Sequence, residues 1–305
     1  MSLMLTPENT LPADGVAGTL IGRAWVPGRI AGPSPIVLRA DGVFDLSEHF
    51  ATLSDLLESD APLSAVRDAP GIFIASVEAL LANTGPDADP SRPYLLPPLD
   101  LQVIKAAGVT FAASMIERVI EEQAGGDAAK AEAVRATVHG VIGDNLRSIV
   151  PGSEQAMRLK AFLIEQDMWS QYLEVGIGPD AEIFTKAPVL ASVGSGSRIG
   201  IHPGSQWNNP EPEVVLAVNS RGQIHGATLG NDVNLRDFEG RSALLLSKAK
   251  DNNASCSIGP FIRLFDDHFS LDDVRACVVD LEVQGEDGYR MHGSSSMSQI
   301  SRDPQ

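Results

Sequence analysis

The sequence predicts an α+β fold in which a largely helical middle part precedes a mostly β second half. Two observations lead to this prediction. Apolar residues recur at helical spacing between residues 109 and 173, and beyond residue 174 short apolar runs alternate with Gly, Asn and Asp. With 305 residues, of which 43% are hydrophobic, the chain has room for one large domain and a smaller lobe.

The N-terminal part, residues 1–95, is predicted to form a small α/β lobe. Pro35–Leu38 and Val43–Leu46 flank a turn at Ala40–Gly42, which favours a β-hairpin followed by short helical pieces. The segment Gly85–Asp100 is then so rich in proline and glycine that it excludes a helix and disfavours a strand. We interpret it as a linker to the main domain or as a segment that wraps around it.

The main domain, residues 96–305, is expected to carry a helical insertion over about 109–173. Val109–Gln123, Ala128–His139 and Glu154–Leu173 have the periodicity of helices, and the last follows a Pro-Gly-Ser start signal. The apolar stripe of that last helix, which we interpret as core, consists of Met157, Ala161, Ile164, Met168 and Tyr172.

Strands are predicted in the second half because β-branched runs there are bounded by turn-forming residues. These runs are Val214–Val218, Ile224–Leu229, Ile258–Leu264 and Val278–Val283. One helical stretch, Ser242–Lys250, interrupts them.

The formal net charge is −17, and an acidic surface repels phosphate backbones and anionic lipid. We therefore expect neither nucleic-acid nor membrane partners. The two cysteines, Cys256 and Cys277, are too few for a disulfide framework or a cysteine metal site. Together with an N-terminus, Met1–Asp14, that lacks the pattern of a secretory signal, this favours a cytoplasmic protein.

A group of carboxylates is the most informative feature of the second half. Glu211 and Glu213 are two residues apart ahead of a predicted strand, so they are expected on one face. Symmetric pairing about the turn Asn219–Gly222 would place Glu213 opposite Thr228. Asp232 would then share the face of the two glutamates, provided that the register does not slip by one residue.

Three neighbouring carboxylates raise one another's pKa unless a cation compensates their charge. Oxygen ligands favour a hard ion, with Mg²⁺ first and Mn²⁺ or Ca²⁺ next. On spacing alone, a solvated acidic strand edge is an equally good interpretation.

Three sequence elements distinguish the two interpretations. PEPEVVLAV contains the E-x-E pair, GATLGNDVNLRD contains an N-D-x-x-x-R-D element, and KAKDNNASCSIGPF places a lysine ahead of a Gly-Pro pair. In these elements residues 101–305 resemble the fumarylacetoacetate hydrolase superfamily. The resemblance implies a mixed β-roll core, a divalent metal on Glu211, Glu213 and Asp232, and Lys250 in the active site.

Further detail indicates one branch of the superfamily. Hydrolase members carry a G-x-N-Y-x-x-H-x-x-E lid, whereas here the matching stretch Gly108–Glu117 has Ser114 at the histidine position. A serine without a base does not activate water at neutral pH. EIFTKAP and SSMSQISRDP, with the elements above, instead resemble 2-keto-3-deoxy-pentonate dehydratases, whose product is 2,5-dioxopentanoate.

This resemblance implies roles for further residues. Lys250 and Glu182 are the candidates for the acid and the base, with the assignment left open, and Lys186 is the candidate for the substrate carboxylate. The candidates for binding substrate hydroxyls are Ser255, Asn252 and Asn253. Without the resemblance, surface positions would be the simpler interpretation of both lysines.

The expected partner is a small 2-keto acid, and the family suggests a homodimer or homotetramer. An acylpyruvate-type C–C hydrolase and a non-catalytic sugar-acid sensor are the alternative functions.

Overall fold

The computed structural model describes residues 4–108, 120, 128–142, 149–169 and 171–304. They divide into two compact units. The first consists of Met1–Lys105, Thr185–Val274 and Val279–Ser294, and the second of Ala106–Phe184, Arg275–Val278 and Ser295–Gln305. Among the described residues, no helix is long and apolar enough to cross a membrane.

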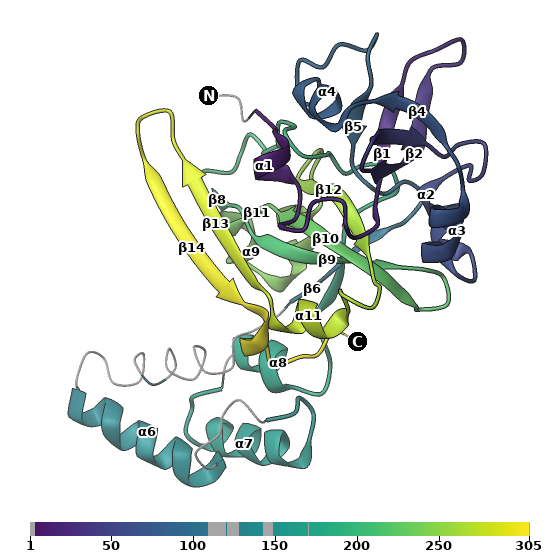
Figure 1. Ribbon diagram of the computed structural model, residues 1–305. Coiled ribbons are helices and arrows are strands. Elements are labelled where there is room, and N and C mark those ends of the chain that lie inside the picture. Colours follow the sequence, from purple (N-terminus) through teal and green to yellow (C-terminus); the bar gives the residue numbers. More distant parts are fainter. Residues whose placement is uncertain (1–3, 109–119, 121–127, 143–148, 170, 305) are drawn as a thin grey trace. The chain divides into compact units, whose positions relative to one another are not determined.

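The first unit is built on a sheet of eight described strands (Figure 1). Their order is β4-β3-β2-β1-β12-β10-β9, with β5 also paired to β1, and all the recorded pairings are antiparallel. The strands are β1 (Leu20–Val26), β2 (Gly32–Arg39), β3 (Gly42–Asp45), β4 (Ile72–Ala75), β5 (Tyr94–Leu96), β9 (Pro212–Val218), β10 (Ile224–Asp232) and β12 (Cys256–Leu264). Because β1 joins β2 to β12, the predicted boundary at residue 95 falls inside this unit.

The predicted N-terminal hairpin is confirmed by β2 and β3, in which Leu38 lies opposite Val43 and Arg39 opposite Gly42. The turn requires its glycine. Gly42 has φ +138°, and a Cβ there would lie 2.8 Å from the carbonyl oxygen of Ala75.

The composition of Gly85–Asp100 disfavours a strand, yet the segment contains one. Tyr94–Leu96 forms the short strand β5 against β1, where Tyr94 lies opposite Trp25 and their rings stack at 6.2 Å between centroids. β12 pairs with β1 only at Leu20 and Ile21, so the rest of that edge of β1 is open to β5. This pairing and the aromatic stacking stabilise a strand despite the neighbouring prolines.

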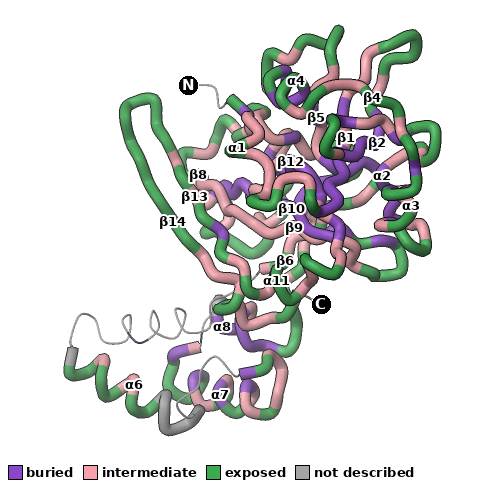
Figure 2. The backbone as a smooth tube through the Cα atoms, in the orientation of Figure 1, coloured by how far each residue is buried: buried purple, intermediate pink, exposed green. Residues whose placement is uncertain are grey.

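Short helices surround the N-terminal strands: α1 (Pro7–Thr10), α2 (Leu53–Glu58), α3 (Pro62–Asp68) and α4 (Val77–Ala82). The leucines of α2, α3 and α4 pack into the buried centre of the sheet, which appears purple in Figure 2. Leu53, Leu56 and Leu80 are fully buried there.

The four strands predicted in the second half are confirmed by β9, β10, β12 and β13 (Val278–Gln284). The helical stretch predicted at Ser242–Lys250 is confirmed as a 3₁₀ turn, η2 (Ala243–Leu245), followed by α10 (Leu246–Lys250). Between β10 and η2 lie β11 (Asn234–Leu235), which pairs with β8 (Asn208–Asn209), and α9 (Arg236–Glu239). β13 pairs with β14 (Arg290–Ser296) in a separate two-stranded sheet.

The second unit is mainly helical. Its elements include α6 (Ala128–Ile142), α7 (Glu154–Glu165), α8 (Gln171–Ile177) and η3 (Met297–Gln299), and its boundary with the first unit runs through β6 (Ile104–Ala107), β7 (Ile183–Ala187) and α11 (Leu271–Ala276). The predicted helix at Ala128–His139 is confirmed by α6. The helix predicted at Val109–Gln123 and the lid position Ser114 lie outside the described residues, except for Ile120.

The single helix predicted over Glu154–Leu173 is in fact two. The chain leaves α7 after Glu165, and Asp167 takes a left-handed φ of +55°. The predicted apolar stripe is confirmed at Met168, which is buried in the core beyond α7, but not within α7. The buried face of α7 consists of Ala156, Leu159 and Leu163, whereas Ile164 is 54% exposed. These positions have i, i+3, i+7 spacing, which the methionines around them obscure in the sequence.

Candidate functional site

The hairpin β9–β10 brings the predicted carboxylates together, although not by the predicted pairing. Glu213 lies opposite Gly230 rather than Thr228, and the backbone N–H of Asp232 donates to the carbonyl of Glu211 at 2.9 Å. The turn shifts the register by one residue, because the backbone N–H of Asn219 donates to the carbonyl of Gln223 rather than to that of Gly222. An irregularity between Ile224 and Gly226 shifts it by one more. One such step would turn Asp232 to the opposite face of the hairpin, and the second step returns it to the face of Glu211 and Glu213.

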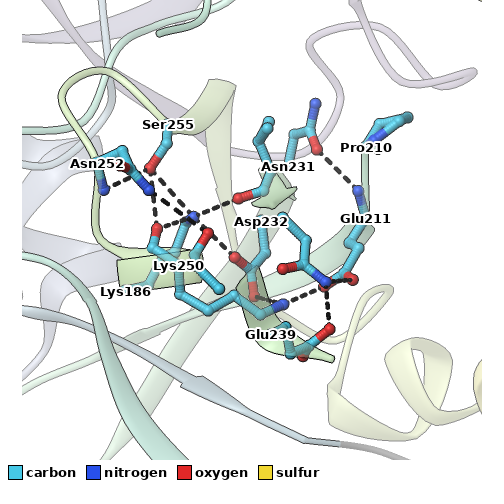
Figure 3. Close-up of polar contacts among 12 residues, drawn as sticks. Lys186, Pro210, Glu211, Asn231, Asp232, Glu239, Lys250, Asn252 and Ser255 are labelled. Atoms are coloured by element: carbon cyan, nitrogen blue, oxygen red, sulfur yellow. Dashed lines mark hydrogen bonds and ion pairs between the residues drawn. The ribbon is translucent and has the colours of Figure 1, made fainter. Parts of the chain in front are cut away.

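Lys250, at the end of α10, lies between two of these carboxylates (Figure 3). Its Nζ donates to Glu211 Oε2 and lies 3.1 Å from Asp232 Oδ2. Burial would lower the pKa of Lys250, but the charges of Asp232 and Glu211 outweigh it and the pKa is raised. Lys250 is therefore held as an ammonium ion.

Lys186, on β7, is the second buried cation of the site and only 1% exposed. Its Nζ donates to the carbonyls of Val233, at 2.8 Å, and Lys250, and to Ser255 Oγ at 3.2 Å. These three acceptors use all three protons of the Lys186 ammonium group. Asp232 Oδ1 lies 2.9 Å from Lys186 Nζ and is therefore an ion-pair partner that receives no hydrogen bond from it.

The segment after Lys250 forms a turn closed by polar side chains. Ser255 Oγ donates to the carbonyl of Lys250 at 2.9 Å and accepts from the N–H of Asn252 at 3.1 Å. The amide of Asn252 donates to the carbonyl of Lys248 at 3.0 Å, while Asn253 is exposed. Lys186, Asn252 and Ser255 thus hold the turn together, and substrate contact by these residues and by Asn253 stays a prediction.

The raised pKa of Glu213 indicates that the negative charge of the three carboxylates exceeds the positive charge beside them. Burial first, then the charges of Asp232 and Glu211, raise the pKa of Glu213 to about 7, and Lys250 opposes them. Three carboxylates face two ammonium groups.

This donor set fits a hard divalent cation. It is made of oxygens, it has excess negative charge, and Asp232 Oδ1 is buried without a hydrogen bond among the described residues. No three His, Cys, Asp or Glu side chains in the described part of the chain are arranged as a metal site as they stand, and Lys250 contacts both Glu211 and Asp232. Metal ligation by Glu211, Glu213 and Asp232 accordingly stays a prediction.

Glu182 belongs to the second unit, just before β7. It is partly buried, its carbonyl accepts from the N–H of Gly108 at 2.8 Å, and a Cβ on Gly108 would collide with its carboxylate. Its catalytic role rests on the sequence alone.

The sequence analysis did not select two residues beside the three carboxylates: Asn234 contacts Glu211, and Glu239 contacts Asn234. Asn234, which is fully buried on β11, donates from Nδ2 to Glu211 Oε1 at 3.0 Å and to Glu239 Oε2 at 2.6 Å. Asn234 lies two residues after Asp232, so the period-two pattern of an extended chain was a usable signal for it. No such signal marks Glu239.

Comparison with known proteins finds dehydratases that are similar to about a third of this chain. Over 98 residues, 32% of this chain and 34% of the relative, the sequence is 40% identical to a probable 2-keto-3-deoxyxylonate dehydratase of Haloferax volcanii. Over 94 residues, 30% of this chain and 32% of the relative, it is 38% identical to a 2-dehydro-3-deoxy-D-arabinonate dehydratase of Saccharolobus solfataricus. The matches thus span about a third of these curated relatives, and no family model matches the chain.

A solved structure extends the likeness over most of the chain. It is that of a 2-keto-3-deoxy-D-arabinonate dehydratase complexed with magnesium and 2,5-dioxopentanoate, with a TM-score of 0.62 at 18% identity, covering 93% of this chain and 79% of the other. The chain has the fold of this dehydratase. The predicted fold class is therefore confirmed, and so is the resemblance to 2-keto-3-deoxy-pentonate dehydratases that the sequence elements indicated.

Proposed function

We propose that this chain is a metal-dependent hydro-lyase that converts a 2-keto-3-deoxy-pentonate to 2,5-dioxopentanoate and water. The observation that carries the proposal is the group formed by the buried Asp232 and Lys250 with the half-buried Glu211 and Glu213, in a chain similar to dehydratases with these substrates in their names. The dehydratase whose fold it shares was solved with magnesium and this product.

The reaction removes a proton from C3 and a hydroxyl from C4 as water, which leaves a double bond between C3 and C4. Loss of a proton from C5 and gain of one at C3 move the double bond to C4–C5, and the resulting enol gains a proton at C4 and loses its hydroxyl proton to give the C5 aldehyde. Mg²⁺ held by Glu211, Glu213 and Asp232 would supply the Lewis acidity that makes the C3 proton of a 2-keto acid easier to remove. Mn²⁺ and Ca²⁺ suit the same oxygen donors.

The chain's own groups must move the protons. Lys250 is buried and is held as an ammonium ion by two carboxylates, so we assign it the delivery of a proton to the departing C4 hydroxyl. Glu182 is the candidate base for the C3 proton, on the strength of its sequence context. Lys186 keeps Asp232 and the carbonyl of Lys250 in place.

The proposal predicts turnover of 2-keto-3-deoxy-xylonate or 2-keto-3-deoxy-arabinonate, measured with an aldehyde dehydrogenase that oxidises the product. Activity should be abolished by EDTA and restored by Mg²⁺, and Glu213→Ala should lose it. Acylpyruvates serve as control substrates. Their cleavage without dehydration would support a C–C hydrolase instead, and tight binding of the sugar acid without turnover would indicate a sensor.

The assembly and location of the protein are part of the same proposal. We expect a cytoplasmic homodimer or homotetramer. We also expect no nucleic-acid partner, since the net charge is −17. Light scattering coupled to size-exclusion chromatography measures the oligomeric state directly.

A further inference from the structure

Asn234 connects two carboxylates that come from different elements. Its side chain is completely buried, and the single Nδ2 group donates one hydrogen to Glu211 Oε1 at 3.0 Å and the other to Glu239 Oε2 at 2.6 Å. Glu211 precedes β9, whereas Glu239 ends α9. One amide therefore fixes the distance between these two segments.

The orientation of the Glu211 carboxylate depends on this amide. Its Oε2 is contacted by Lys250, while Oε1 has Asn234 as its close donor, because Nδ2 of Asn209 is farther away at 3.4 Å. Asn231 accepts from the backbone N–H of Glu211 at 3.0 Å, and so holds the main chain but not the carboxylate (Figure 3).

Glu239 in turn determines which way the amide faces. Its Oε2 also accepts from Arg236 Nη1 at 2.8 Å, which fixes the carboxylate beside Asn234. Because a carboxylate lies on each side of the Asn234 side chain, its NH₂ group, and not its carbonyl oxygen, points towards both. Its Oδ1, which is buried, has no hydrogen-bond partner among the described residues, so the two carboxylate contacts are what orients the group.

We propose that Asn234 is a positioning residue that holds Glu211 in the orientation required to bind the divalent cation. This inference rests on the proposed function, since it assumes that Glu211 is a ligand. Hydrogen-bond partners of metal ligands typically contribute a factor of 10 to 100 in metal affinity.

The test measures Mn²⁺ binding to the purified full chain by electron paramagnetic resonance, independently of turnover. Asn234→Ala should raise the Kd for Mn²⁺ by roughly 10- to 100-fold. Asn83→Ala is the matched control, because Asn83 is also a buried asparagine whose Nδ2 donates to oxygens, here the carbonyls of Asp89, Arg92 and Pro93. Its Kd should stay within about threefold of wild type, as expected for a site with no shared partners.

Asn234→Ser is the milder variant to use if Asn234→Ala does not fold, since a hydroxyl retains one donor. Its Kd should exceed that of wild type, and it should lie below that of Asn234→Ala where the alanine variant folds. If wild type binds Mn²⁺ and both folded variants bind it equally tightly, the positioning role is wrong while the proposed function stands. Failure of the wild type to bind Mn²⁺ would overturn both.

Discussion

Lys250 is a cation shared by Glu211 and Asp232, and its removal is predicted to affect chemistry more than folding. Lys250→Met retains the buried methylene chain and deletes the ammonium group. A lost proton donor lowers kcat by about 10²- to 10⁴-fold. Steady-state kinetics with saturating Mg²⁺ measures the change.

The matched control is Lys248→Met, two residues earlier on α10. Lys248 is exposed and lies over the ring of Phe238, 4.8 Å from its centroid, away from the carboxylates. Its kcat should equal that of wild type. If Lys250→Met keeps wild-type kcat, Lys250 is not the proton donor.

Much of the candidate site was predictable at the level of single residues. The glutamate pair, Asp232 and Lys250 were identified from the motifs, and the structure brings them together. Glu239 was not, because its approach to Asn234 depends on how α9 turns after β11, which no local pattern encodes. The bonds of Lys186 to two backbone carbonyls were equally inaccessible, since main-chain acceptors leave no mark in a sequence.

At the scale of elements, the first N–H groups of α2 are capped by a carboxylate that is distant in sequence. Asp100, 5% exposed, accepts from the N–H groups of Leu53, at 2.6 Å, and Ser54, at 3.0 Å. Replacing Asp100 with Ala would leave these donors without their acceptor, so we expect the free energy of unfolding to fall by about 1–3 kcal/mol. Urea unfolding followed by circular dichroism measures this value.

Asp100→Asn provides the comparison, because an amide oxygen can still accept one of these bonds. It should lose less stability than Asp100→Ala. Equal losses in the two variants would show that the charge, rather than the capping bond, matters.

The turn after Lys250 is predicted to depend on Gly200. A Cβ at Gly200 would lie 1.8 Å from the carbonyl oxygen of Asn253, and the N–H of Gly200 donates to Ala254 at 3.1 Å. Gly200→Ala must therefore displace the backbone that carries Ser255, and we expect kcat/KM to fall by about tenfold or more, as small misplacements at a site do.

Gly32→Ala is the control for this change. A Cβ at Gly32 meets no atom within 4 Å, and the residue has no left-handed φ. It should leave kcat/KM unchanged. Wild-type kinetics for Gly200→Ala would mean that the turn does not support the site.

Elements with a clear local pattern were predictable, and those determined by distant contacts were not. The hairpin β2–β3 and the strands β9, β10 and β12 follow from apolar runs and turn residues. The register of β9–β10 did not, because its turn and irregularity add residues that the symmetric pairing omits. The short strand β5 depends on its pairing with β1, where Tyr94 lies opposite Trp25, and this partner is distant in sequence.

For the whole molecule, a cation that binds the native site should raise thermal stability. At a Mg²⁺ concentration of 100 times the Kd, mass action adds about 2.7 kcal/mol to the free energy of unfolding. Differential scanning calorimetry of EDTA-treated protein with added Mg²⁺ should show an increase in Tm that grows with concentration.

Glu211→Ala is the control in this experiment, since it removes one proposed ligand. Its Tm should respond little to Mg²⁺ over the same range. An equal increase in wild type and variant would place the stabilising cation elsewhere.

The order of strands in the large sheet also affects how the protein is made. β1 ends at residue 26, but its neighbour β12 begins at residue 256, and β12 is also the link to β10 and β9. A growing chain on the ribosome can pair β1 with β2 early, yet it lacks the central strand until most of the polypeptide has emerged. The sheet, and with it the carboxylate group on β9 and β10, is completed late, which favours slow folding and dependence on protection of the nascent chain.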